Sequence, residues 1–216
     1  MPQVFGKGSN VLVKVTLIGG GLLLFTVVMV GMYMTPYTHD LGIAFDQPAP
    51  FSHKHHFEQL GIHCKYCHTQ VEDARFAGVP ATETCMTCHS QIWTNSPLLE
   101  PVRSSYAKGE PIRWNRITNA PDFVYFNHSV HIAKGVSCFT CHGRVDQMNL
   151  MYKENAFEMK WCLNCHRNPE QFVRPKAEIY NPNYAPSQDH AALGRELVKT
   201  LGIEKEQIQN CSVCHR

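Results

Sequence analysis

Hydrophobic positions are concentrated in one uninterrupted run near the start of the chain. Val15 to Met34 carries no charged side chain over 20 residues. At about 1.5 Å per residue a helix of this length spans about 30 Å, the thickness of the hydrocarbon core of a bilayer. The run predicts a transmembrane helix at residues 11–34, preceded by a short segment at residues 1–10.

The charges beside this run predict its orientation. Lys7 and Lys14 precede it, whereas His39 and Asp40 follow it. The positive-inside rule then places residues 1–10 in the cytoplasm and everything after about residue 35 on the outer side of the membrane. A cleaved signal peptide is the alternative, but the run exceeds the roughly 7–15 apolar residues of a signal core and no small-x-small cleavage site follows it.

The remainder of the chain has no second apolar run. Residues 35–50 contain three prolines and are expected to form an extended linker. Near the C-terminus, Leu193, Leu197 and Leu201 recur at helical spacing, which predicts a helix broken at Gly202. Residues 93–124 are interpreted as a loop or a docking surface.

All ten cysteines fall into five copies of Cys-x-x-Cys-His, and none is left over. In chain order the copies are motif 1 (Cys64, Cys67, His68), motif 2 (Cys85, Cys88, His89), motif 3 (Cys138, Cys141, His142), motif 4 (Cys162, Cys165, His166) and motif 5 (Cys211, Cys214, His215). Each copy offers two thiols to the vinyl groups of one haem and an imidazole to its iron. Zinc sites and disulfide frameworks also use paired cysteines, but neither requires a histidine after every second cysteine. The sequence predicts five covalently bound haem c groups.

This cofactor content limits the fold. Residues 51–216, the predicted haem domain, supply only about 33 residues per haem, too few to build a sheet or bundle around each one. We expect a mostly irregular domain with short α-helices at the motifs and little or no β-strand.

The haem domain contains an internal repeat. "FSHKHHFEQLGIHCKYCH" (51–68) and "FNHSVHIAKGVSCFTCH" (126–142) share Phe-x-His-x-x-His followed by Gly and Cys-x-x-Cys-His. A second motif follows each copy, which indicates two dihaem modules at 51–89 and 126–166, with the fifth haem at 211–215.

The repeat also supplies candidates for the second axial ligands. His53 and His56, like His128 and His131, are three residues apart and would project to the same side of a helix. They cannot occupy opposite faces of one haem, so one member of each pair is expected to serve a neighbouring haem. The alternative interpretation is that these are packing histidines.

Four such histidines leave one of the five haems without a second ligand. The leading candidates are Met148, Met159 and His190, followed by Met151, His39, His55 and His63. A methionine ligand would raise the potential of its haem, although buried methionine is more often a packing residue.

The net charge excludes nucleic acid as a partner. The chain has a formal charge of +2, and haem propionates, about −2 per group against about +1 on each ferric core, shift the total to about −3. The lipid bilayer and other redox proteins remain as the expected partners.

The repeated module resembles the class III, or cytochrome c3-type, multihaem cytochromes. In that family the first histidine of the pair serves the next haem motif and the second serves another haem. The resemblance implies that His53 completes the haem of motif 1 and His128 that of motif 3, whereas His56 and His131 reach other haems.

A longer pattern resembles the pentahaem cytochrome c component of bacterial alternative complex III, a quinol oxidoreductase. It comprises the uncleaved anchor, the five motifs, "FSHKHH", "PDFVYFNHSVH" (121–131) and "EMKWCLNCHR" (158–167), and covers most of residues 11–216. The resemblance implies a subunit that is not catalytic alone. It would be anchored in the bacterial cytoplasmic membrane with its haems on the periplasmic side.

The same resemblance implies the partners. Electrons would arrive from an iron–sulfur protein subunit supplied by integral membrane quinol-oxidising subunits, and leave for a monohaem cytochrome or a soluble periplasmic cytochrome or copper carrier. The alternative is a stand-alone quinol dehydrogenase of the NapC/NrfH type, but Thr69 and Gln70 follow motif 1 where one form of that family continues with x-Met. A multihaem enzyme is disfavoured because no motif suggests an open iron.

Overall fold

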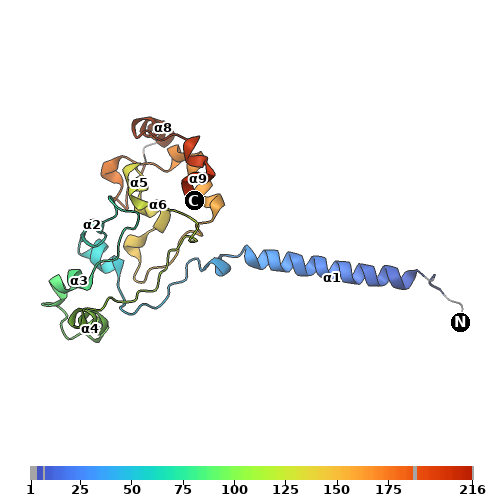
Figure 1. Ribbon diagram of the computed structural model, residues 1–216, viewed down its shortest axis with the longest axis horizontal. Coiled ribbons are helices and arrows are strands. Elements are labelled where there is room, and N and C mark those ends of the chain that lie inside the picture. The colour runs from blue at the N-terminus through green and yellow to red at the C-terminus, as the bar shows by residue number, and fades with distance from the viewer. Residues whose placement is uncertain (1–3, 7, 187–188, 216) are drawn as a thin grey trace. The chain divides into compact units, whose positions relative to one another are not determined.

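The computed structural model describes residues 4–6, 8–186 and 189–215, and the chain divides into two units, Met1–Leu41 and Gly42–Arg216. In the first unit, α1 (Ser9–Tyr33) is a single helix of 25 residues, drawn in blue in Figure 1. It ends before Pro36, which begins the short helix η1 (Pro36–His39). Residues 11–34, which include nearly all of α1, are exposed. By length and composition α1 can cross a membrane, as the apolar run predicted.

The second unit consists of short helices joined by long loops (Figure 1). In chain order these are η2 (Lys54–Gln59), α2 (Cys64–Cys67), α3 (Thr82–His89), η3 (Pro97–Leu99), α4 (Glu100–Lys108), α5 (His128–Ala133), α6 (Cys138–His142), η4 (Val145–Gln147), α7 (Met159–Arg167), η5 (Pro169–Gln171), η6 (Lys176–Glu178), α8 (His190–Thr200), η7 (Gln207–Gln209) and α9 (Cys211–Cys214). Among the described residues, extended pairing is limited to the isolated bridges Ala44–Tyr152 and Val136–Val173. The predicted fold class is confirmed.

The two cysteines of each motif lie on their own short helix, α2, α3, α6, α7 or α9, and His68 and His215 directly follow α2 and α9. The helical turn brings the two thiols and the following imidazole of a motif to one place. Local capping starts several of these turns: the Ser137 hydroxyl accepts a hydrogen bond from the Phe139 amide before α6, and the His63 ring accepts one from the Lys65 amide before α2.

The apolar core of the second unit is small. Its central cluster is Val71, Ile132 and Ile179, and it packs against the Cys138 thiol and Tyr180. The buried hydrophobic residues of the described chain are Ala49, Val71, Val102, Ile132, Val136, Met148, Val173 and Ile179. So few buried side chains form a small apolar core for a unit of this size, which agrees with the expectation that haems supply much of the interior.

The last long helix packs closely on the segment after motif 4. In α8, a Cβ atom on Gly194 would lie 1.9 Å from the carbonyl oxygen of Glu170, in η5, so only glycine permits this approach. The helix ends at Thr200, before Gly202, which has a positive φ of 60°. The predicted break at Gly202 is confirmed.

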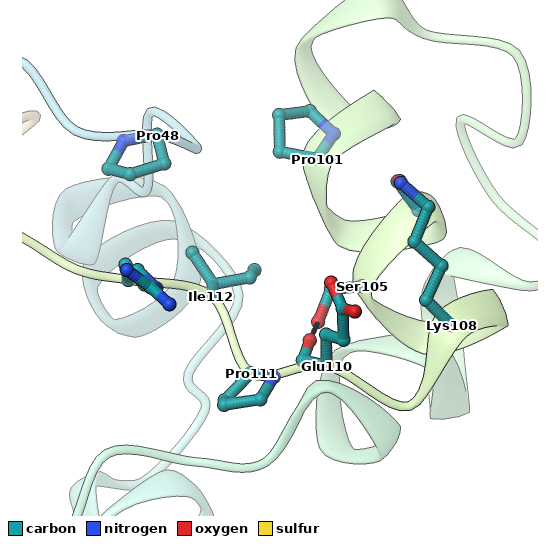
Figure 2. A pocket seen from close by; sticks show the side chains of 9 residues that line it. Pro48, Pro101, Ser105, Lys108, Glu110, Pro111 and Ile112 are labelled. Atoms are coloured by element: carbon teal, nitrogen blue, oxygen red, sulfur yellow. Dashed lines mark hydrogen bonds between the residues drawn. The ribbon is translucent and has the colours of Figure 1, made fainter.

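A shallow hollow of about 220 Å³ lies beside α4 (Figure 2). Pro48, Pro101 and Ile112 line it, and the Ser105 hydroxyl donates a hydrogen bond to the Glu110 carbonyl at its base. Its lining contains no cysteine or histidine, so we do not assign it to a haem.

Candidate haem-binding sites

The two copies of the sequence repeat have the same aromatic contacts. Phe51 stacks on His56 at 4.4 Å between ring centroids and meets His53 edge-on at 4.9 Å. In the second copy, Phe126 stacks on His131 at 4.4 Å and meets His128 edge-on at 4.8 Å. The phenylalanine of the repeat therefore holds both histidine rings of its module. The first copy forms a π-helical turn, a rare conformation that is frequent at functional sites, whereas the second is α-helical.

A hydrogen bond to the main chain fixes most of the predicted ligand rings. For His56 and His131 the acceptor of the Nδ1 hydrogen bond is the carbonyl four residues earlier, at 2.8 and 2.7 Å. The other acceptors are the carbonyls of Gly78 for His68, Ile92 for His89, Arg75 for His128, Ile208 for His166 and Phe123 for His215. An imidazole that donates from Nδ1 keeps the lone pair of Nε2 for a metal, as metal-bound histidines generally do.

Three pairs of imidazoles lie at a nearly constant distance, with interplanar angles that range from 2° to 66°. The ring centroids are 6.2 Å apart for His56 and His89, and 6.2 Å apart for His131 and His166. For His128 and motif 3 His142 the distance is 6.4 Å, with the rings within 2° of parallel. Two imidazoles bonded to one metal on opposite sides, each at about 2 Å, place their centroids about 6 Å apart. The gap in each pair therefore has room for one iron.

His53 lies close to two motif histidines. Burial, followed by the nearness of His68, lowers the pKa of His53 to about 4. Burial and the nearness of His128 likewise lower the pKa of His142 to about 4, and burial lowers the pKa of His56 and His131. These rings are neutral at physiological pH, which is the form that binds a metal.

The candidates for the remaining ligand lie in different surroundings. Met148 is buried, and its carbonyl accepts a hydrogen bond from Lys54 in η2. Met159 is 61% exposed. His190 turns its Nε2 toward the Gln171 carbonyl at 3.1 Å, and its buried Nδ1 has no hydrogen-bond partner. The motif 5 ring of His215 lies 5.7 Å from the ring of Phe123.

The ten cysteines of the five motifs share one chemical state. All ten are free thiols, and none forms a disulfide even though they occur in closely spaced pairs. Within the described ranges, no group of three or more Cys, His, Asp or Glu side chains is arranged to hold a metal ion.

Apolar surface borders the thiols. A hollow of about 310 Å³ reaches Cys85 and has walls made by Val79, Pro80, Ile112 and Trp114. In the second module, Phe157 lies 5.0 Å from Trp161 and 6.4 Å from His142, ring to ring. Thiols, neutral imidazole pairs and apolar walls together fit a covalently bound porphyrin.

Comparison with known proteins supports the same cofactor. Residues 124–216 match the family model described as cytochrome c7 and related cytochrome c. The menaquinone reductase multiheme cytochrome c subunit of Nitratidesulfovibrio vulgaris is 31% identical over an alignment of 144 residues, and the match covers 57% of this chain and 69% of that protein. The chain belongs to the multihaem cytochromes c. Covalent haem c and electron transfer are therefore properties of its family.

The geometry adds two features of this multihaem cytochrome that the sequence patterns did not reveal. Phe51 and Phe126 were visible as repeated letters, but their contact with both histidine rings was not. The carbonyls of Arg75, Gly78 and Ile208 orient histidines that are 10 to 53 residues away in the chain. Since a carbonyl belongs to every residue, no side-chain motif could have identified these acceptors.

Proposed function

We propose that the chain is a five-haem, membrane-anchored electron-transfer subunit of a quinol oxidoreductase of the alternative complex III type. Each motif histidine supplies one axial ligand, and His53, His56, His128 and His131 supply the second ligand of the haems of motifs 1, 2, 3 and 4, in that order. Met148, Met159 or His190 supplies the second ligand of the remaining haem.

The imidazole pairs carry this proposal. An iron with imidazoles on both faces has no open position for a substrate, so such haems accept and donate electrons without binding a reactant. Ring-centroid distances of 6.2 to 6.4 Å at three of the five motifs support this pairing. These pairs support the assignment of the chain as an electron relay.

The anchor and the comparisons support the setting. One apolar helix, α1, would hold the relay at the cytoplasmic membrane with its haem domain on the periplasmic side. The relative from Nitratidesulfovibrio vulgaris is named as part of a menaquinone reductase. The proposed partners are an iron–sulfur protein, integral quinone-reacting subunits, and a periplasmic cytochrome or copper carrier.

The direction of electron flow has two candidates. The resemblance to alternative complex III favours quinol oxidation and transfer toward a periplasmic carrier. The name of the relative favours electron delivery toward menaquinone. Stopped-flow reduction of the haems by a menaquinol analogue, compared with reduction by a periplasmic carrier, distinguishes the two directions in the purified complex.

Gentle detergent extraction tests the proposed setting. We expect the chain to copurify with large integral membrane subunits and an iron–sulfur protein, and the isolated chain to lack quinol oxidation activity. Blue native electrophoresis with haem staining and mass spectrometry identifies the partners. Quinol oxidation by the chain alone, at the rate of the membranes, would instead support the stand-alone dehydrogenase.

A further inference from the structure

The histidine pairs connect the haem motifs two at a time. His53, the residue before η2, lies close to motif 1, and His56 in η2 lies close to motif 2; in α5, His128 lies close to motif 3 and His131 to motif 4. Each of these helical turns spans only a few residues, so the two motifs that it serves must be neighbours. A hydrogen bond of 3.0 Å between Tyr66 in α2 and Thr87 in α3 also joins motifs 1 and 2.

Contacts between the modules join motif 1 to motif 3. The amide and Nδ1 of His128 both lie within hydrogen-bond distance of the Arg75 carbonyl, at 3.1 and 2.9 Å. The Lys54 amide donates to the Met148 carbonyl at 3.0 Å, which joins η2 to the segment after α6. Burial raises the pKa of the Cys138 thiol to about 12, and the nearness of Cys64 contributes to the increase.

Motif 5 adjoins motif 4. The Nδ1 atom of His166 lies 2.6 Å from the Ile208 carbonyl, three residues before Cys211. Burial raises the pKa of the Cys162 thiol, and the nearness of Cys214 raises it further. From the other side, the amide of Tyr125, next to the repeat of the second module, donates to the Cys214 carbonyl at 2.8 Å.

Exposure distinguishes the ends of this series from its middle. Of the ten cysteines, Cys88 in motif 2 and Cys211 in motif 5 are exposed, whereas the other eight are partly buried. Both cysteines of motif 3, Cys138 and Cys141, are among the partly buried ones. The two motifs with a single neighbour in the contact series are therefore the two that carry an exposed cysteine.

We infer that the five haem-attachment motifs form one row in the spatial order 2, 1, 3, 4, 5, and that redox proteins exchange electrons with the chain at its ends, motifs 2 and 5. The order differs from the chain order because the first module is reversed: its second motif lies outermost. Bound haem supplies one-electron transfer between neighbouring sites. The inference rests on the proposed relay function and adds the two motifs at which other redox proteins contact the chain.

Two spin labels test the order in the full-length holoprotein. Thr94 is exposed, five residues beyond His89, and Asp122 is exposed next to Phe123, whose carbonyl contacts His215. Because the ten native cysteines are consumed by haem attachment, the variants T94C and D122C each offer one reactive thiol for a nitroxide. Ferric haem accelerates the relaxation of a nearby nitroxide, and the acceleration falls steeply with distance.

Removing one end haem should affect one label and spare the other. With C85S/C88S, the label at position 94 is expected to lose most of its enhanced relaxation, while the label at position 122 keeps it. With C211S/C214S, the label at position 122 is expected to lose most of its enhanced relaxation, while the label at position 94 keeps it. A label at position 94 that responds as strongly to C211S/C214S as to C85S/C88S would overturn the order.

A second variant keeps the test decisive if the cysteine variants fail to mature. His56→Ala leaves both cysteines of motif 2 in place and should create one high-spin ferric haem there. We expect faster relaxation of the label at position 94 only; a change at position 122 contradicts the order. These outcomes require only attached haems, so they are independent of whether membrane subunits copurify.

Discussion

Replacing His131 by alanine is expected to convert one of the five haems from low spin to high spin. The His131 ring faces His166 at 6.2 Å, so its removal leaves the iron of motif 4 with a single imidazole. His128 faces His142 instead, so H128A should convert a different haem. Electron paramagnetic resonance of the oxidised protein is expected to show one high-spin haem for each single variant and two for H128A/H131A.

His55→Ala is the matched control for these variants. It lies between His53 and His56, but its Nδ1 is 2.7 Å from the Gln59 side-chain oxygen and its ring stacks on Trp93 at 5.8 Å. We expect H55A to leave all haems low spin. One high-spin haem in the double variant would mean that both histidines serve the same iron, and an unchanged low-spin spectrum would exclude both as ligands.

Replacing both cysteines of motif 3 by serine is expected to prevent stable folding of the second unit. The main apolar cluster, Val71, Ile132 and Ile179, packs directly against Cys138. Without haem this region would retain a small core, and a domain is stable by only about 5–15 kcal/mol in total. Haem staining and immunoblotting of membranes should show C138S/C141S reduced to a small fraction of the wild-type level.

Motif 2 provides the comparison for that variant. Cys88 is exposed, and α3 lies outside the main apolar cluster. We expect C85S/C88S to accumulate as a four-haem protein with resistance to limited proteolysis near that of the wild type. Equal accumulation and equal protease resistance of C138S/C141S would show that the motif 3 haem is not part of the folding core.

The sequence predicted the features that depend on local spacing. The apolar run at 15–34 became α1, and every Cys-x-x-Cys-His motif became a short helix because its residues are close in the chain. The Phe-x-His-x-x-His repeat predicted two modules, and their aromatic geometry agrees within 0.1 Å for both ring distances.

Local spacing could not predict which residues far apart in the chain come into contact. From the sequence, His131 could bind any of several haems. The fold brings the His166 ring, 35 residues further along the chain, close to His131. Arg75 and His128 are 53 residues apart and meet through a backbone carbonyl, which has no side-chain signature. The order of the motifs depends on contacts of this kind, so spacing could define the modules but not their arrangement.

Haem stoichiometry tests the central claim most directly. The full-length protein is purified from membranes, its haem is measured as the pyridine haemochrome after denaturation, and its mass is measured intact under denaturing conditions. The account predicts five haems per chain, all retained covalently and with no free thiol. Two or fewer haems per chain, with the remaining cysteines free or in disulfides, would contradict it.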